Sequence, residues 1–102
     1  MGYVIWPDGD RGDAVREIYD ACRRAQDKFA PFKNAHEAHS VIREEFEEFW
    51  EAVRRNDLDA ARKEATQLGA MALRFLVEVK DANTYVQPKT TEEIAAEVRG
   101  TK

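Results

Sequence analysis

The sequence predicts an all-α protein, and three observations lead to this prediction. Apolar residues recur at intervals of three and four through three long segments, which is the period of a helix with one buried face. Short polar side chains stand at the expected starts of these segments, and Pro31 separates the first from the second. No segment shows a convincing strand pattern. The short connections predict an antiparallel helical bundle of three main helices with a short C-terminal helix.

Composition limits the architecture and the location of the protein. A chain of 102 residues with 43% hydrophobic residues suits a single domain over residues 1–102 with a modest core. The lone Cys22 cannot form an intramolecular disulfide, which favours a reducing compartment such as the cytoplasm. No apolar run approaches membrane-spanning length, and the first residues are too soon interrupted by Pro7 to form a signal peptide. We therefore expect a soluble, cytoplasmic protein without a membrane partner.

The charge balance argues against a nucleic-acid polymer as the main partner. The formal net charge is −4, and no run of Lys and Arg offers a stripe that could follow a phosphate backbone. A single nucleotide remains compatible with this charge if metal ions bridge the negative groups.

The first helix is expected to begin at Asp13. Residues 1–12 contain Pro7, Gly9 and Gly12 among aspartates and predict a turn-rich lead-in, in which residues 4–6 can pack against the body. After Asp13 the apolar residues follow helical spacing until Pro31 ends the helix. These residues are Val15, Ile18, Tyr19, Cys22, Ala25 and Phe29.

Polar capping residues define the start of each remaining helix. Asn34 with Glu37 predicts a capping box and a second helix that runs to about Arg55. The turn at residues 56–59 provides an N-cap for a third helix. The expected apolar face of this third helix consists of Ala61, Ala65, Leu68, Ala72, Phe75, Leu76 and Val79.

The C-terminal part is predicted to form a short fourth helix after a linker. The linker is assigned to residues 82–90, which include Pro88. Thr90 with Glu93 forms a second candidate capping box. The apolar face of this helix would consist of Ile94, Ala95 and Val98.

Residues 42–51 of the second helix contain five glutamates, and two of them are predicted to point inward or sideways. A helix advances by about 100° per residue, so the direction of each side chain follows from its number. Glu45 lies in the middle of the apolar stripe, and Glu48 lies about 60° to one side of it. Glu44 lies about 100° away on that same side. Glu47 and Glu51 have an ordinary explanation as surface residues beside arginines.

The third helix repeats this pattern with Glu64. Glu64 lies within about 40° of Leu68 in the apolar face, and Gln67 lies on the shoulder beside it. If the two helices pack antiparallel, these two side chains can converge with Glu45 and Glu48. A cation would relieve the repulsion, and oxygen ligands favour Mg²⁺, with Mn²⁺ as an alternative. The simpler alternative is that these glutamates are neutralised by arginines such as Arg43, Arg62 or Arg74, or are exposed at an end of the bundle.

These residues resemble the motifs of the MazG-like all-α nucleoside triphosphate pyrophosphohydrolases. That family has Glu-Glu-x-x-Glu on one helix and Glu-x-x-Asp on the next. Residues 44–48 match the first motif, and residues 64–67 match the second except that Gln67 replaces the aspartate. The resemblance covers about residues 36–79 and implies an oligomeric all-α enzyme that uses Mg²⁺ to release pyrophosphate and a monophosphate.

The resemblance also implies roles for single residues. Glu45, Glu48 and Glu64 would be metal ligands, and Glu44 would be a further acidic member of the catalytic site. Gln67 stands at the fourth ligand position, where an uncharged amide is expected to hold the ion less tightly.

Other residues flank the predicted site and are candidates for substrate binding. Arg74 and Lys80 are candidates for phosphate binding or ordinary surface cations, and His36 for contact with a nucleotide at the helix start. His36 and His39 stand one residue too close for the His-Glu-x-x-His zinc motif and are more typical of a surface. Trp50, with Phe46, forms a second apolar surface that predicts packing against the first helix or another protomer, or stacking on a base.

The sequence therefore predicts a Mg²⁺-dependent nucleoside triphosphate pyrophosphohydrolase that assembles as a homodimer or homotetramer. Its substrate would be a ribonucleoside or deoxyribonucleoside triphosphate. The alternative is a non-catalytic helical module that senses nucleotides or regulates a partner through a degenerate metal site. A di-iron carboxylate bundle is less compatible, since no histidine follows a glutamate at the Glu-x-x-His spacing.

Overall fold

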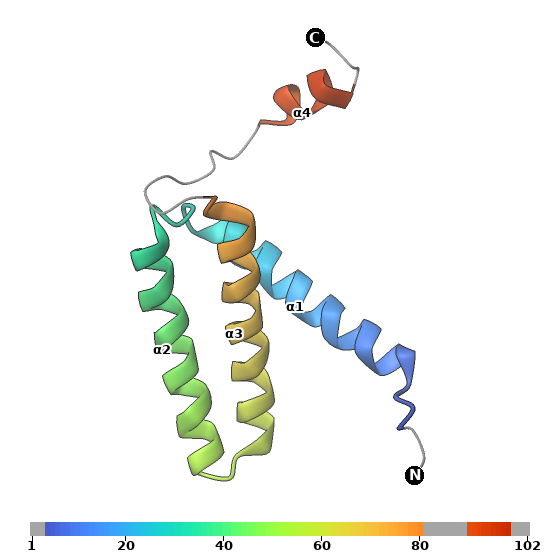
Figure 1. The fold of residues 1–102 in the computed structure, drawn as a ribbon, viewed down its shortest axis with the longest axis vertical. Helices are drawn as coiled ribbons and strands as arrows, with labels where there is room; N and C mark the ends of the chain where they lie inside the picture. The colour runs from blue at the N-terminus through green and yellow to red at the C-terminus, as the bar shows by residue number, and fades with distance from the viewer. Residues whose placement is uncertain (1–3, 81–89, 99–102) are drawn as a thin grey trace.

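The computed structural model describes residues 4–80 and 90–98 of the chain. It contains helices α1 (Asp8–Lys28), α2 (Ala35–Arg54), α3 (Leu58–Glu78) and α4 (Thr91–Val98) (Figure 1). No strand occurs in these two ranges, which confirms the all-α prediction. In the same part of the chain, no helix combines the length and the apolar character needed to cross a bilayer.

Helices α2 and α3 form an antiparallel hairpin, as predicted (Figure 1). Asn56 adopts a left-handed conformation with φ of 58°, which reverses the chain after α2. The N–H groups of Asn56 and Asp57 then donate to the carbonyls of Val53 and Ala52 at 2.9 and 3.0 Å. The carboxylate of Asp57 accepts from Ala60 N–H at 3.1 Å and caps α3.

Both predicted capping pairs are present. Asn34 Oδ1 accepts from Glu37 N–H at 2.9 Å, and the Glu37 carboxylate accepts from Lys33 N–H, one residue before the usual position. At α4, Thr90 Oγ1 accepts from Glu93 N–H, and the Glu93 carboxylate accepts from Thr90 N–H. Most of the predicted 82–90 linker lies outside the described residues. Helix α4 makes no contact with the other three helices within the described parts of the chain (Figure 1).

The predicted lead-in over residues 1–12 is wrong for its second half, because α1 begins at Asp8. Pro7 precedes the helix with φ of −62°, and Asp8 and Asp10 place negative charge in its first turn, where the helix dipole favours it. Residues 4–6 are exposed and do not pack against the body.

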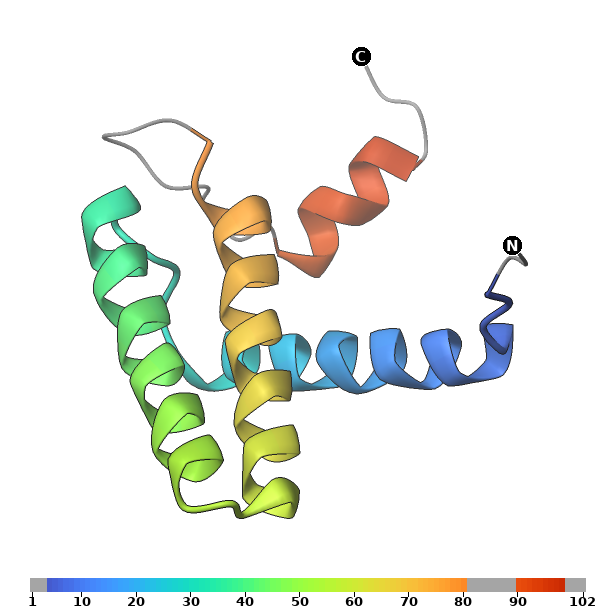
Figure 2. The ribbon, with the colours of Figure 1, turned by 60° about the horizontal axis from the view of Figure 1, so that its bottom comes forward.

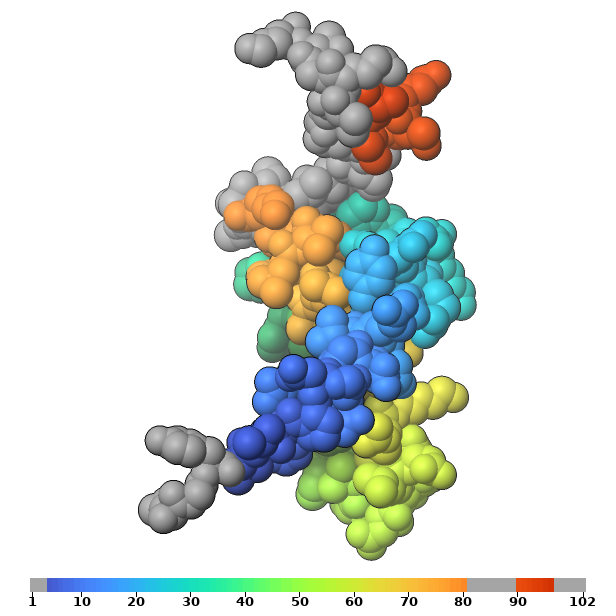
Figure 3. Space-filling model, turned by 90° about the vertical axis from the view of Figure 1, so that its right-hand side faces the viewer, coloured from blue at the N-terminus to red at the C-terminus, as the bar shows by residue number. Residues whose placement is uncertain are grey.

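Helix α1 does not lie alongside the hairpin as a third antiparallel member. It crosses α3 at a steep inclination (Figures 2 and 3), and its N-terminal half diverges from the hairpin (Figures 1 and 2). Gly69 of α3 allows Ile18 of α1 to approach closely, since a Cβ at this position would lie 3.1 Å from Ile18 Cδ1. Small residues continue the contact, and the core includes Ala21, Cys22, Ala25, Phe32, Ala38, Ala70, Met71 and Val79. Helix α3 is thus the central helix that contacts both α1 and α2.

The expected apolar face of α3 is partly wrong. Ala65, Ala72 and Leu76 are exposed, whereas Arg74 and Glu78 are buried. Because α1 crosses α3 steeply, it covers other α3 residues than it would if the two helices lay side by side. The identity of these residues depends on long-range packing, so helical periodicity alone did not reveal them.

Arg74 and Glu78 form a buried ion pair that connects three segments of the chain. Arg74 donates from Nε and Nη2 to the two Glu78 oxygens at 2.8 and 3.0 Å, and from Nη2 to the Ala30 carbonyl at 3.0 Å. Glu78 also accepts from Gln26 Nε2 and Phe32 N–H, each at 2.8 Å. The Arg74 guanidinium lies 4.1 Å from the centre of the Phe32 ring.

The environment of Glu78 keeps its carboxylate charged. Burial alone would raise its pKa, but the hydrogen bonds from Arg74, Gln26 and Phe32 hold the pKa below its ordinary value. The nearby Cys22 thiol has a raised pKa because of burial and the negative charge of Glu78. Its thiol is therefore a neutral core group.

Replacing Arg74 with methionine should strongly destabilise the protein. Methionine replaces the apolar stem of Arg74 but leaves Glu78 buried without its cation. Arg74→Met should therefore reduce the free energy of unfolding by about 3–5 kcal/mol. Urea unfolding measures this loss. The double variant Arg74→Met/Glu78→Leu should recover a large part of it, because no unpaired charge remains.

The matched control is Arg54→Met, which removes an exposed ion pair on α2. The side chains of Arg54 and Glu51 are 60% and 50% exposed, so the expected loss is below about 1 kcal/mol. Equal losses for Arg74→Met and Arg54→Met would contradict the role given to the buried pair.

Candidate metal centre

Three of the predicted glutamates converge on one place between α2 and α3. Glu45 and Glu48 come from successive turns of α2, and Glu64 comes from the facing turn of α3. One carboxylate oxygen from each lies within 4.8 Å of the other two. Glu45 and Glu64 are half-buried where the antiparallel helices meet, and Glu48 is exposed beside them. We call Glu45, Glu48 and Glu64 the acidic triad.

Glu45 is the member of the acidic triad with the strongest electrostatic perturbation. Partial burial raises its pKa from 4.5 to about 7, with further contributions from the charges of Glu48 and Glu64, a hydrogen bond with Glu48, and the charge of Glu44. Protonation of Glu45 would partly relieve the repulsion within the acidic triad. A divalent cation would relieve it more completely.

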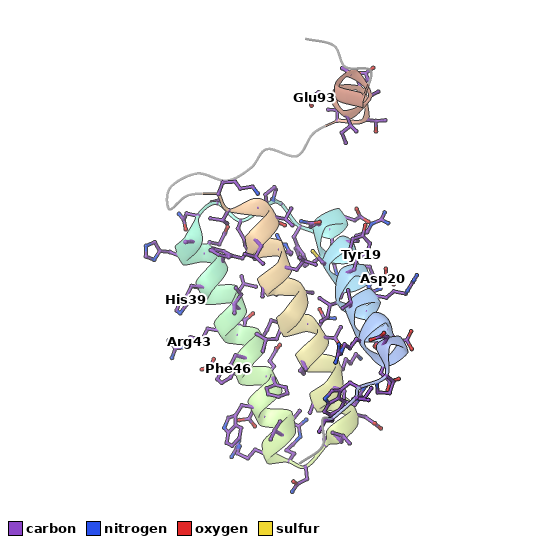
Figure 4. The ribbon with its side chains drawn as sticks, turned by 45° about the vertical axis from the view of Figure 1, so that its right-hand side comes forward. Tyr19, Asp20, His39, Arg43, Phe46 and Glu93 are labelled. Carbon is purple, nitrogen blue, oxygen red and sulfur yellow. The ribbon has the colours of Figure 1, made fainter. Side chains whose placement is uncertain are left out.

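Arginine neutralisation, the simpler alternative, does not occur in the described part of the chain. Arg43 lies 3.8 Å from Glu47, and Arg74 pairs with Glu78. Arg43 and His39 also project from α2 away from α3 (Figure 4). Within residues 4–80 and 90–98, no Lys or Arg forms an ion pair with the acidic triad.

A groove of about 720 Å³ adjoins the acidic triad. It lies between the C-terminal half of α1, residues 29–33 and the α2–α3 hairpin, and we call it the triad groove. Glu44 and Glu45 line one part of it, together with Gln67 of α3. The predicted fourth ligand, Gln67, therefore faces the same space as Glu45.

The structure places the predicted substrate-binding residues at different locations. Arg74 lines the triad groove, but its guanidinium is engaged with Glu78 and Ala30. His36, Trp50 and Lys80 are exposed, and none of them lines this groove. The triad groove instead contains Arg24 of α1, which sequence reasoning missed. Its only signal was a position between Ala21 and Ala25, at the edge of the apolar face.

The donor set of the acidic triad is compatible with a hard divalent cation. Mg²⁺ and Mn²⁺ prefer carboxylate, amide and water oxygens, and the triad provides three carboxylates with Gln67 nearby. No His or Cys belongs to the cluster, which disfavours a structural zinc site.

Comparisons of the chain with family models, curated proteins and solved structures gave no match. The similarity to the MazG-like family therefore depends on the glutamate motifs of residues 44–48 and 64–67.

The ionisation of Glu45 should make the metal-free protein less stable as the pH rises. Its pKa is higher in the folded state, so this contribution to stability is fully present below about pH 4.5 and is lost as the pH rises to about 7. Thermal melting in chelator at pH 5 and pH 8 measures the effect. Glu45→Gln should melt higher than the wild type at pH 8 and show a smaller change between the two conditions.

Glu47→Gln is the matched control on the same helix, since the Glu47 side chain is 64% exposed. Its pH dependence should equal that of the wild type. A wild type and a Glu45→Gln variant with identical pH profiles would contradict the raised pKa of Glu45.

Proposed function

We propose that the protein is a Mg²⁺-dependent nucleoside triphosphate pyrophosphohydrolase. The observation that carries this proposal is the convergence of Glu45, Glu48 and Glu64 beside a groove of nucleotide size. The same residues carry the resemblance to the MazG-like family. A ribonucleoside or deoxyribonucleoside triphosphate would be cleaved to a monophosphate and pyrophosphate.

In this proposal the residues of the chain divide into ligands and a proton acceptor. Glu45, Glu48 and Glu64 would hold the cation, and the amide oxygen of Gln67 would add a weaker, uncharged ligand. Glu44 lines the same groove and would orient the attacking water and accept its proton. When bound, Mg²⁺ would supply the positive charge that stabilises the leaving pyrophosphate. No protein nucleophile is required.

Hydrolysis of a panel of ribonucleoside and deoxyribonucleoside triphosphates tests the proposal. With Mg²⁺, at least one substrate should give a monophosphate and pyrophosphate, and chelator should stop the reaction. Glu64→Gln should reduce turnover by about a hundredfold or more, because one charged ligand is lost. Glu47→Gln should retain wild-type turnover.

The nature of the products decides whether the assignment is correct. A diphosphate with orthophosphate would contradict it, and so would equal turnover of Glu64→Gln and the wild type.

The alternative is a nucleotide sensor that binds but does not hydrolyse its ligand. Gln67 favours this alternative, since it replaces the aspartate of the family motif and lowers the negative charge of the site. Nucleotide binding without products in the same assay would support the sensor.

We also propose that the protein assembles as a homodimer or homotetramer through the outer face of α2. Phe46 and Trp50 are 55% and 53% exposed there, and large aromatic side chains are typical of interface centres. Sedimentation over a dilution series tests this assembly, and a monomer at every concentration would contradict it.

A further inference from the structure

We propose that the triad groove binds the nucleoside and its first phosphate, and that Arg24 binds that phosphate. The identity of this ligand rests on the proposed function, since the acidic triad would hold the ion at the remaining phosphates. Binding of a monophosphate needs no ion at the triad, so the two proposals can be tested separately.

The interior of the triad groove suits a nucleoside. Its volume of about 720 Å³ lies within the range of small-molecule sites, about 300–1,000 Å³. Apolar side chains from all three main helices and from the α1–α2 connection line it, including Ala25, Phe32, Val41 and Met71.

Positive charge on the α1 side of the groove suits a phosphate. Arg24, Lys28 and Lys33 line this groove, and none of them forms an ion pair within the described residues. Arg74 does not contribute in the same way, because Glu78 neutralises it. The groove therefore places unneutralised cations opposite Glu44 and Glu45. A ligand that carries phosphates and apolar rings is complementary to this arrangement.

Arg24 is the cation best placed to act near the acidic triad. It also lines a second groove of about 600 Å³, which lies between α1 and the N-terminal half of α3. Gln67 is the other residue that lines both grooves, and it shares the triad groove with Glu45. Arg24 and Gln67 thus stand where the two grooves meet. A guanidinium there can donate two parallel hydrogen bonds to a phosphate.

Calorimetric titration in chelator tests the inference without hydrolysis. The probes are the monophosphates of adenosine, guanosine, cytidine and thymidine, with inorganic phosphate and the free nucleosides as comparison ligands. At least one monophosphate should bind the wild type more tightly than its nucleoside and more tightly than phosphate. Arg24→Gln should raise its Kd by about tenfold, the effect of losing a charged hydrogen bond.

Arg23→Gln is the matched control, because it removes the same charge from the adjacent exposed residue, which lines neither groove. Its Kd should equal that of the wild type. Equal weakening by both variants would overturn the inference, since only the net charge would then matter. Phosphate binding as tight as monophosphate binding would overturn the nucleoside part.

The combined results separate this inference from the proposed function. No monophosphate binding, together with Mg²⁺-dependent turnover in the wild type, would overturn the groove assignment and leave the enzyme assignment standing. Monophosphate binding that depends on Arg24, without turnover of any triphosphate, would support the groove and contradict the enzyme.

Discussion

The buried ion pair of Arg74 and Glu78 is the interaction on which the arrangement of the helices depends. It connects α3 to α1 through Gln26, and to the α1–α2 connection through Ala30 and Phe32. These contacts fix the C-terminal half of α1 against the central helix, where it forms one wall of the triad groove. Among residues 4–80 and 90–98, every buried side-chain nitrogen and oxygen has a hydrogen-bond partner, and such a satisfied network favours one packing over its alternatives.

Glu78 and Glu45 lie in opposite electrostatic environments. Glu78 has an arginine partner and two further donors, Gln26 and the Phe32 N–H, so its pKa is lowered and its charge is retained in the core. Glu45 is partly buried among other carboxylates, and this burial together with their negative charge raises its pKa to about 7. The first arrangement is complete within the protein and stabilises it. The second leaves a surplus of negative charge beside a groove, which is the electrostatic condition for binding a cation.

Local patterns in the sequence predicted the helices and the acidic triad, but not the crossing of α1. The caps at Asn34, Asp57 and Thr90 depend on neighbours within four residues, so they could be read directly. The triad followed from the helical period and the short turn between α2 and α3. The burial of Arg74 and the position of Arg24 in the groove depend on contacts between distant segments. Helix α1 begins early because it accommodates two exposed glycines, Gly9 and Gly12, in its first turns. No local pattern encodes these features.

The central claim is that Glu45, Glu48 and Glu64 hold a divalent cation. Diffraction from crystals grown with Mn²⁺, measured for its anomalous signal, tests this claim most directly, because Mn²⁺ accepts the oxygen ligands that suit Mg²⁺. The account predicts an anomalous peak between the three carboxylates in the wild type and a weaker peak or none in Glu64→Gln. The account would be contradicted if anomalous peaks for Mn²⁺ occurred only at other carboxylates and none occurred at the acidic triad.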